Sequence, residues 1–331
     1  YKKRGISINW YQQKSELPLL KREFPFFKEI HSQVLQDTLK RLDKAYDAFF
    51  RRLKRGEKAG FPRFQGKNRF DSITYTQSGF TLVTEGKPIL RLSKIGDIRV
   101  KLHRQPQGKI KTCCIKRKNG KYFASLVCEL EVPQKQLSLP IRHVGIDLGV
   151  MHLAVTSDGQ FFENPKYLRK AERQLKKLQR IVSKRKKGSN RYRKAVRLLA
   201  KKHERIANQR RDTAHKISRT LVEQYDLIAF ENLNIQGMVK NHRLAKNIVD
   251  SAWRQLIQFT TYKAEYADKR VVLVNPYNTS QQCSNCGQIV KKTLAERIHR
   301  CTCGYTEDRD VNAAKNILRL ALEMEQSKVS A

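Results

Sequence analysis

The order of strand and helix patterns after Pro140 constrains the fold of this chain more than any other feature. Short apolar runs predict five strands, and a long charged segment with helical spacing, residues 166–219, separates the third strand from the fourth. This order is typical of a mixed α/β domain, which we expect at residues 141–322, followed by a flexible tail at 323–331. The predicted strands span residues 142–148, 151–157, 160–163, 225–231 and 271–275.

The segment 166–219 holds 22 Lys or Arg against three acidic residues, a net charge of +19. The whole chain carries +39, from 69 basic and 30 acidic residues, which is more than solubility requires. Solvated helix pairs normally mix charges of both signs, so the scarcity of acids favours a basic helical hairpin that binds nucleic-acid phosphates. Its candidate contacts are Lys176, Lys177, Arg180, Lys184, Arg185, Lys186, Lys187 and Arg193.

Two other patterns precede Pro140. Residues 1–58 repeat apolar positions every three or four residues from 17 to 55, which predicts an amphipathic helical layer. Residues 59–140 alternate between apolar and polar positions, with Gly and Pro breaks, which predicts a small β-barrel or sandwich. The pair Asn119–Gly120 is typical of a type I′ hairpin turn. Strands are expected at residues 72–76, 88–92, 98–102, 110–116 and 121–132.

Four of the seven cysteines fall within 21 consecutive positions, 283–303, as C-x₂-C and C-x-C separated by fourteen residues. Two such pairs, each ending in a glycine, are typical of a zinc ribbon, which we expect at residues 279–305 with a structural Zn²⁺. The second pair is one residue tighter than usual, so His299 is an alternative fourth ligand. The favoured ligands are Cys283, Cys286, Cys301 and Cys303.

Asp147 interrupts an apolar strand, where its neighbours on the same face are Gly145 and Gly149. A lone carboxylate there would be costly to ionise, but a cation beside it reverses the balance. The glycines would leave space for a metal ion and a phosphate. A satisfied structural Asp in a turn is the alternative, and other acidic residues must decide between the two.

Two other acidic residues are candidate ligands of the same cation. Glu231 ends an apolar strand, at the edge where open α/β sheets place their ligands. Asp310 begins a helix and shares a face with Ala313 and Ala314, whose small side chains allow close packing against a sheet. Three carboxylates can therefore meet at one end of the sheet, and such hard oxygen ligands suit Mg²⁺ or Mn²⁺.

At these residues the chain resembles the TnpB or OrfB proteins of insertion sequences, whose nuclease domain is RuvC-like with an RNase H fold. "GIDLG", "FENLNI" and "DRDVNAAKNI" are similar to the family's three acidic motifs, and "TSQQCSNCG" is similar to the start of its zinc ribbon. Residues 17–50 and 60–76 resemble its helical recognition and wedge regions. The resemblance implies an α+β multidomain protein: a RuvC-like mixed α/β nuclease domain with an inserted zinc ribbon, a helical recognition segment and a small β-barrel wedge domain.

The same resemblance implies a function. Asp147, Glu231 and Asp310 would be the catalytic acids of an RNA-guided DNA endonuclease, ancestral to type V CRISPR effectors and often labelled a transposase. Its cofactors would be catalytic Mg²⁺ or Mn²⁺ and structural Zn²⁺, and its partners a transposon-derived guide RNA and target DNA. The family usually begins with a further strand and helix before the position of Tyr1, so an amino-terminal part is expected to be missing.

Two other functions fit parts of the sequence. A catalytically silent RNA-guided repressor would show the loss of an acidic residue, and none is lost. An actin-like ATPase also places Asp-x-Gly on a first strand, but a later glycine-rich phosphate hairpin is absent and the charge of +39 argues against it. Since no apolar run approaches a membrane span and no signal pattern begins the chain, we expect a cytoplasmic bacterial protein that is nucleoid-associated when bound to DNA.

Overall fold

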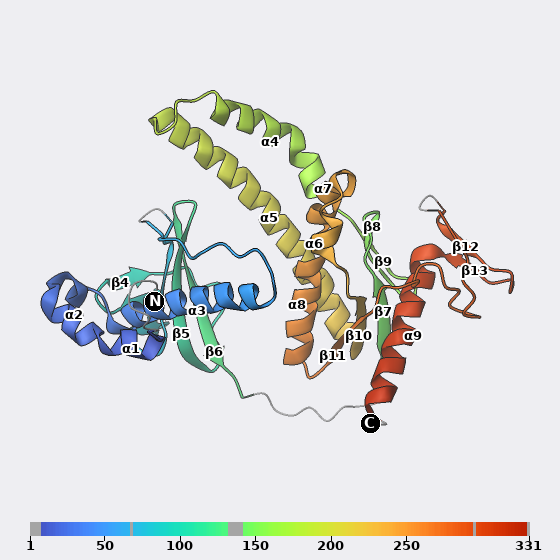
Figure 1. Cartoon of the computed structure of the whole chain (residues 1–331), viewed down its shortest axis with the longest axis horizontal. Coiled ribbons are helices and arrows are strands. Elements are labelled where there is room, and N and C mark those ends of the chain that lie inside the picture. The colour runs from blue at the N-terminus through green and yellow to red at the C-terminus, as the bar shows by residue number, and fades with distance from the viewer. Residues whose placement is uncertain (1–7, 67–68, 132–141, 294–295, 330–331) are drawn as a thin grey trace. The chain divides into compact units, whose positions relative to one another are not determined.

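The chain folds as two units, residues 1–132 and 133–331 (Figure 1). The computed structural model describes residues 8–66, 69–131, 142–293 and 296–329. Parts of all four predicted segments lie outside the described residues: 1–7 of the helical segment, 67–68 and 132–140 of the wedge region, 141 and 294–295 of the mixed α/β domain with its zinc ribbon, and 330–331 of the tail.

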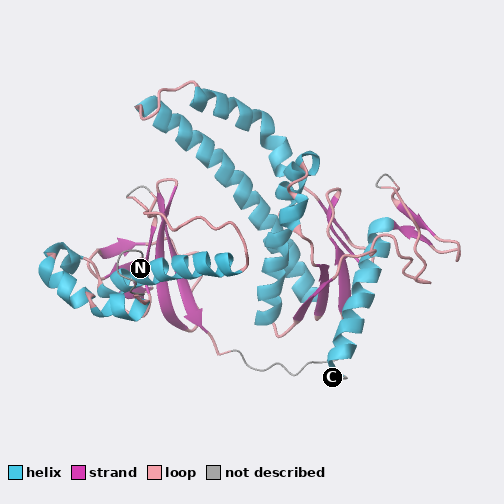
Figure 2. Cartoon of the chain, viewed as in Figure 1, coloured by secondary structure: helices cyan, strands magenta, loops and turns pink. Residues whose placement is uncertain are grey.

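The first unit begins with helices and continues with strands, as Figure 2 shows by colour. The helical layer expected before residue 58 is present, and its last helix buries Val34 and Leu35. Its helices are α1 (Trp10–Ser15), α2 (Leu17–Glu23), the 3₁₀ helix η1 (Pro25–Glu29) and α3 (Ser32–Lys54). Its strands are β1 (Ser72–Tyr75), β2 (Phe80–Val83), β3 (Ile89–Leu92), β4 (Gly96–Arg99), β5 (Lys109–Lys118) and β6 (Lys121–Glu129).

These six strands form two antiparallel sheets, ordered β1-β5-β6 and β2-β3-β4. The two sheets and helix α3 share one core, because Tyr75 of β1, Leu90 of β3 and Val34 of α3 pack in a single buried cluster. Asn119 and Gly120 both have positive φ in the turn between β5 and β6, as the type I′ prediction requires. Strand β2 was not expected from the sequence.

The second unit contains the remaining helices and strands. All five strands expected after Pro140 are present, with ends that lie within two residues of the prediction. The strands are β7 (His143–Asp147), β8 (His152–Thr156), β9 (Phe161–Glu163), β10 (Leu227–Glu231), β11 (Arg270–Val274), β12 (Ile298–Arg300) and β13 (Thr306–Asp308). The helices are α4 (Tyr167–Ser183), α5 (Asn190–Gln224), α6 (Ile235–Met238), α7 (His242–Ser251), α8 (Trp253–Tyr266) and α9 (Arg309–Val329).

A five-stranded mixed sheet, ordered β11-β10-β7-β8-β9, is the centre of this unit. Strands β11, β10 and β7 are parallel, and β8 and β9 continue antiparallel. Apolar residues on one face of the sheet pack with Leu221 of α5 and Leu256 of α8. Residues on the other face pack with Ile317 and Ala321 of α9. The fold is therefore mixed α/β, with helices on both faces of the sheet.

The expectation of a flexible tail is wrong, because residues 323–329 form the last turns of α9. Ion pairs of Glu323 with Arg319 and of Glu325 with Arg270 of β11 hold this end of the helix. Among the described residues, no helix is both long and apolar enough to cross a membrane.

Candidate functional site: three carboxylates beside a four-cysteine cluster

Asp147 is the last residue of β7, at the carboxyl end of the central strand. Val144 and Ile146 are fully buried in the core that faces α5 and α8. Strand alternation therefore turns Gly145 and Asp147 toward the opposite face, which α9 covers. The predicted alternation is confirmed, and it places the carboxylate on the α9 side of the sheet.

Gly145 has a different role from the one the sequence suggested. A Cβ atom at this position would lie 2.0 Å from the backbone oxygen of Ala314 and 2.6 Å from the backbone nitrogen of Leu318, both in α9. The missing side chain thus admits a helix backbone, not a metal ion and a phosphate. The expectation for Gly145 is wrong because the helix that carries Asp310 occupies that space.

Glu231 is the last residue of β10 and is only 7% exposed. The parallel register pairs Phe230 with Ile146, so the next residues along the two strands are Glu231 and Asp147. Ala229, two residues earlier, packs in the cluster that includes α9, which shows that Glu231 is on the same face as Asp147. The hydroxyl of the buried Thr279 donates a hydrogen bond to Glu231 Oε1.

Asp310 lies in the first turn of α9. Ala313 and Ala314 are buried, as the close packing expected for them requires. Asp308, the last residue of β13, accepts hydrogen bonds at Oδ1 from the backbone N–H groups of Asp310, at 2.8 Å, and of Val311, at 3.3 Å. Asp308 therefore caps the helix, which fixes the turn that carries Asp310.

The electrostatic surroundings link the three carboxyl groups. Burial first, and then the charges of Glu231 and Asp310, raise the pKa of Asp147 well above its usual value, while Arg309 opposes the rise. Burial raises the pKa of Glu231, against the hydrogen bond from Thr279. Burial, followed by the charge of Asp308, also raises the pKa of Asp310. Buried carboxyl groups whose ionisation is disfavoured are suited to binding a cation, which would remove that penalty.

The four cysteines form a tighter group than the acids. Their sulfur atoms all lie within 4.8 Å of one another, and among the described residues no other set of three or more metal-ligating groups is gathered so closely. The three carboxylates share a face and an edge, but they are not drawn together to that degree. Cys283 is buried, whereas Cys286 and Cys303 are exposed.

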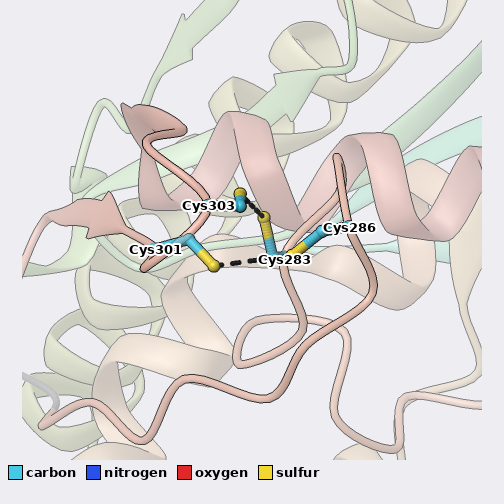
Figure 3. Close-up of side chains that lie close together, drawn as sticks. All are labelled: Cys283, Cys286, Cys301 and Cys303. Atoms are coloured by element: carbon cyan, nitrogen blue, oxygen red, sulfur yellow. Dashed lines mark hydrogen bonds between the residues drawn. The ribbon is translucent and has the colours of Figure 1, made fainter.

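Figure 3 shows the four sulfur atoms turned toward a common centre. Cys283 Sγ lies 3.9 Å from Cys303 Sγ, and Cys286 Sγ lies 3.5 Å from Cys301 Sγ. A hydrogen bond from the backbone N–H of Tyr305 is the main cause that lowers the pKa of Cys303 to about 6, so this thiol is readily deprotonated for a metal ion. Four converging sulfur donors are suited to a structural Zn²⁺.

His299, the alternative fourth ligand, is not part of this group. It is fully buried in β12, where its Nδ1 contacts the ammonium group of Lys292. Burial lowers the pKa of His299, and the charge of Lys292 adds to that effect. The described geometry therefore favours four cysteines, although the second pair is shortened.

The basic hairpin is present as α4 and α5, which pack through Ala171, Leu175 and Ile206. All eight predicted nucleic-acid contacts are exposed. Lys176 forms an ion pair with Glu172 at 2.9 Å, so its charge is partly matched within the helix. Five basic residues line a surface cavity of about 720 Å³: Arg173, Lys176, Lys177 and Arg180 of α4, and Lys184, which caps its end.

Asp250 of α7 holds the base of the hairpin. Its carboxylate accepts hydrogen bonds from the backbone N–H groups of Leu168, at 3.0 Å, and Arg169, at 3.4 Å, in the first turn of α4. Arg210 of α5 donates to the same carboxylate, at 2.7 and 2.9 Å. Asp250 therefore ties three helices together. Its position in the sequence gave no signal of this, since its partners are 40 or more residues away.

Comparison with known proteins identifies the family. The chain is 32% identical over 321 residues, 95% of its length, to a protein of Streptomyces pristinaespiralis named "Putative RNA-guided DNA endonuclease", of which it covers 78%. It is 34% identical to the Escherichia coli protein named "Putative RNA-guided DNA endonuclease InsQ", with 89% of this chain and 76% of that protein covered. Residues 125–242 match the OrfB_IS605 family, described as "Probable transposase". The chain belongs to the TnpB/OrfB family.

Other matches of this TnpB/OrfB chain agree. Residues 253–317, which include Cys283 to Cys303 and Asp310, match the domain described as "Cas12f1-like, TNB domain". A "CRISPR-associated endodeoxyribonuclease Cas12f1" of Sulfoacidibacillus thermotolerans is 27% identical over 61% of this chain and 50% of that protein. A solved Cas12f1-sgRNA-target DNA complex aligns with 96% of this chain and 87% of that chain, at 17% identity and a TM-score of 0.40, a likeness too low to carry an argument.

Proposed function

We propose that this TnpB/OrfB chain is a transposon-associated, RNA-guided DNA endonuclease that hydrolyses target-DNA phosphodiesters at Asp147, Glu231 and Asp310. The observation that carries the proposal is the position of these three carboxyl groups on the α9 side of one sheet edge. Burial raises the pKa of each, and the charges of Glu231 and Asp310 raise that of Asp147 further. The names of its relatives support RNA and DNA as partners.

The finer architecture is part of the proposal. The mixed sheet with helices on both faces supports a RuvC-like nuclease domain of RNase H fold in the second unit. The two antiparallel sheets around one core support a barrel-like wedge domain in the first unit, and helices α1 to α3 support a recognition segment.

The acid site fits Mg²⁺ or Mn²⁺, because its donors are hard carboxylate oxygens that repel one another without a cation. Asp147, Glu231 and Asp310 would together hold a pair of such ions. When bound, such a pair activates water and stabilises the departing 3′ oxygen. The protein contributes fixed ligand positions, set by the ends of two parallel strands and by a capped helix.

The four-cysteine cluster fits a Zn²⁺ with a structural role, because four sulfur donors leave no position open for a substrate. The exposed cations of the hairpin, from Lys176 to Arg193, fit the phosphate backbone of a nucleic acid. Their positions are separate from both metal sites in the sequence, so binding and cutting can be disabled independently.

The test is cleavage of a labelled duplex that matches a bound guide RNA, measured beside a mobility shift at the same salt concentration. With Mg²⁺ the wild type cuts, and Asp147→Ala loses at least about 1,000-fold in rate with guide and target binding unchanged, because the remaining carboxylates hold the ions poorly. Replacing Lys184, Arg185, Lys186 and Lys187 with Ala weakens binding and flattens its salt dependence, by up to about 0.9 log unit per lost phosphate contact.

Other outcomes would favour the rival functions. A wild type that binds guide and target but never cuts with Mg²⁺ or Mn²⁺ is the silent repressor. Tight binding of ATP, with no affinity for RNA, is the actin-like ATPase. Normal cutting by Asp147→Ala would show that the acids are wrongly assigned.

A further inference from the structure

The segment between β11 and the first cysteine pair connects the two candidate metal sites. It begins near Thr279, whose hydroxyl donates to Glu231, and it continues directly into Cys283 of the four-cysteine cluster. Thr279 is 3% exposed and Cys283 is 1% exposed. Five consecutive residues, 279–283, therefore join a proposed ligand of the catalytic cations to a ligand of the proposed zinc.

Two asparagines of α9 hold this segment. Asn316 donates through Nδ2 to the backbone oxygens of Thr279, at 2.9 Å, and Gln282, at 2.7 Å. Asn312 donates to the same Gln282 oxygen at 2.8 Å, and its Oδ1 accepts from the backbone N–H of Ser284 at 2.9 Å. Both asparagines are fully buried. Buried amides with several backbone partners fix the main chain they contact, because each lost bond would leave an unpaired polar group.

The Gln282 side chain extends the connection in both directions. Its Oε1 accepts from Arg319 of α9 at 2.9 Å, and its Nε2 donates to the backbone oxygen of Gly287 at 3.1 Å. Gly287 follows Cys286 and donates its own N–H to the oxygen of Cys283 at 2.9 Å. The first cysteine knuckle is thus bonded to the same helix that carries Asp310.

We infer that residues 279–284 form a positioning clamp. In it the Thr279 hydroxyl orients the Glu231 carboxylate for its cation, while Asn316 holds Thr279, and Asn312 holds Gln282 and Ser284, against α9. This inference rests on the proposed function, because it concerns the ligands of the same catalytic ions. A hydrogen bond to one carboxylate oxygen restricts rotation of the group and leaves the other oxygen for a metal ion. Thr279 is accordingly a positioning residue that acts through Glu231.

The experiment compares Thr279→Val, which keeps the shape and removes the hydroxyl, with Thr279→Ser, which keeps the hydroxyl. Thr260→Val is the matched control, because Thr260 is also fully buried and its hydroxyl donates only to the backbone oxygen of Leu256 in its own helix. Mn²⁺ affinity of the purified protein is measured by titration calorimetry. The Mg²⁺ concentration for half-maximal cutting and the zinc content are measured on the same samples.

Thr279→Val is expected to weaken Mn²⁺ binding by about 10-fold or more and to raise the Mg²⁺ requirement similarly, the range that outer-shell partners usually give. Zinc content and target binding stay at wild-type values. Thr279→Ser and Thr260→Val stay within about twofold of wild type, since neither removes the bond to Glu231.

Two results would overturn the clamp alone: a Thr279→Val protein with the Mn²⁺ affinity of wild type, or equal losses in Thr279→Val and Thr279→Ser. Failure of the proposed function has a different signature. In that case the wild type does not cut, and Asp147→Ala binds Mn²⁺ as the wild type does, which would overturn the clamp together with the active site.

Discussion

The two candidate metal sites gather their ligands in opposite ways. The four cysteines come from one stretch of 21 positions and bring their sulfur atoms within 4.8 Å of one another. The three acids come from two strands and a helix spread over residues 147 to 310, and the structure holds them less closely. The cysteine sulfur atoms lie close together, whereas burial and the charges of Glu231 and Asp310 raise the pKa of Asp147.

The cysteine site depends on local structure, whereas the acid site depends on the tertiary fold. The cysteine site depends on two turns, so it should form wherever the ribbon forms. The acid site depends on strand register, on the packing of α9 against β7 and on the cap at Asp308, so changes far from any acid should disturb it.

The largest effect on stability is expected from the double variant Cys283→Ser, Cys301→Ser. It should lose the single Zn²⁺ proposed for the wild type and lower the Tm by about 5 to 10 °C, because that ion would be the main bond between the two turns. Metal analysis after gel filtration and thermal unfolding measure these effects. The pair Cys114→Ser, Cys128→Ser, outside the cluster, is the control that keeps its zinc. Full zinc content in the Cys283→Ser, Cys301→Ser variant would show that these two cysteines do not bind the metal.

A smaller loss is expected from Gly145→Ala, which tests the acid site without touching an acid. Its new Cβ would lie 2.0 Å from the Ala314 backbone oxygen, so α9 must move and carry Asp310 with it. We expect a destabilisation of about 1 to 3 kcal/mol and a loss of cutting, measured by urea unfolding and by guided cleavage. Gly60→Ala, where a Cβ meets nothing within 4 Å, should behave as wild type.

The zinc content of Gly145→Ala tests whether the cysteine site depends on the position of α9. We expect about one Zn²⁺ per chain, since all four cysteine ligands come from the two turns and none from α9. A variant that loses zinc together with cutting would show that the ribbon depends on the position of α9 as strongly as the acids do.

The sequence predicted the cysteine set and the strand pattern because both are local. A C-x₂-C pair and a C-x-C pair specify a site by spacing, and alternation specifies which face of β7 Asp147 occupies. Thr279 and the glycine contact with α9 were missed, since each depends on a partner brought near only by the tertiary fold. Asp308 was also missed, although an Asp directly before a helix is a local capping signal. The tail was predicted to be flexible, but α9 continues to Val329, and Glu323 and Glu325 form ion pairs near this end.

The remaining prediction concerns the penalty that the acid site imposes on the metal-free protein. The pKa of Asp147 is raised in the folded state, by burial first and then by Glu231 and Asp310, above the value of about 3.9 in an unfolded chain. The folded state therefore binds this proton more tightly, so its stability falls as the pH rises from the unfolded pKa through the raised one. Asp147→Asn removes the ionisation and should remove that loss.

We therefore expect Asp147→Asn to raise the Tm of the metal-free protein by about 2 to 5 °C at pH 7, with the difference shrinking as the pH falls toward 4. Asp268→Asn, an exposed position in the same unit, should leave the Tm unchanged at both values. Added Mg²⁺ should reverse the order, because only the wild type gains a full set of ligands for the cation. Thermal unfolding at two pH values, with and without Mg²⁺, measures all three effects. If Asp147→Asn is less stable than wild type at pH 7 without metal, the carboxylate has a structural partner and the acids do not repel one another as the comparison requires.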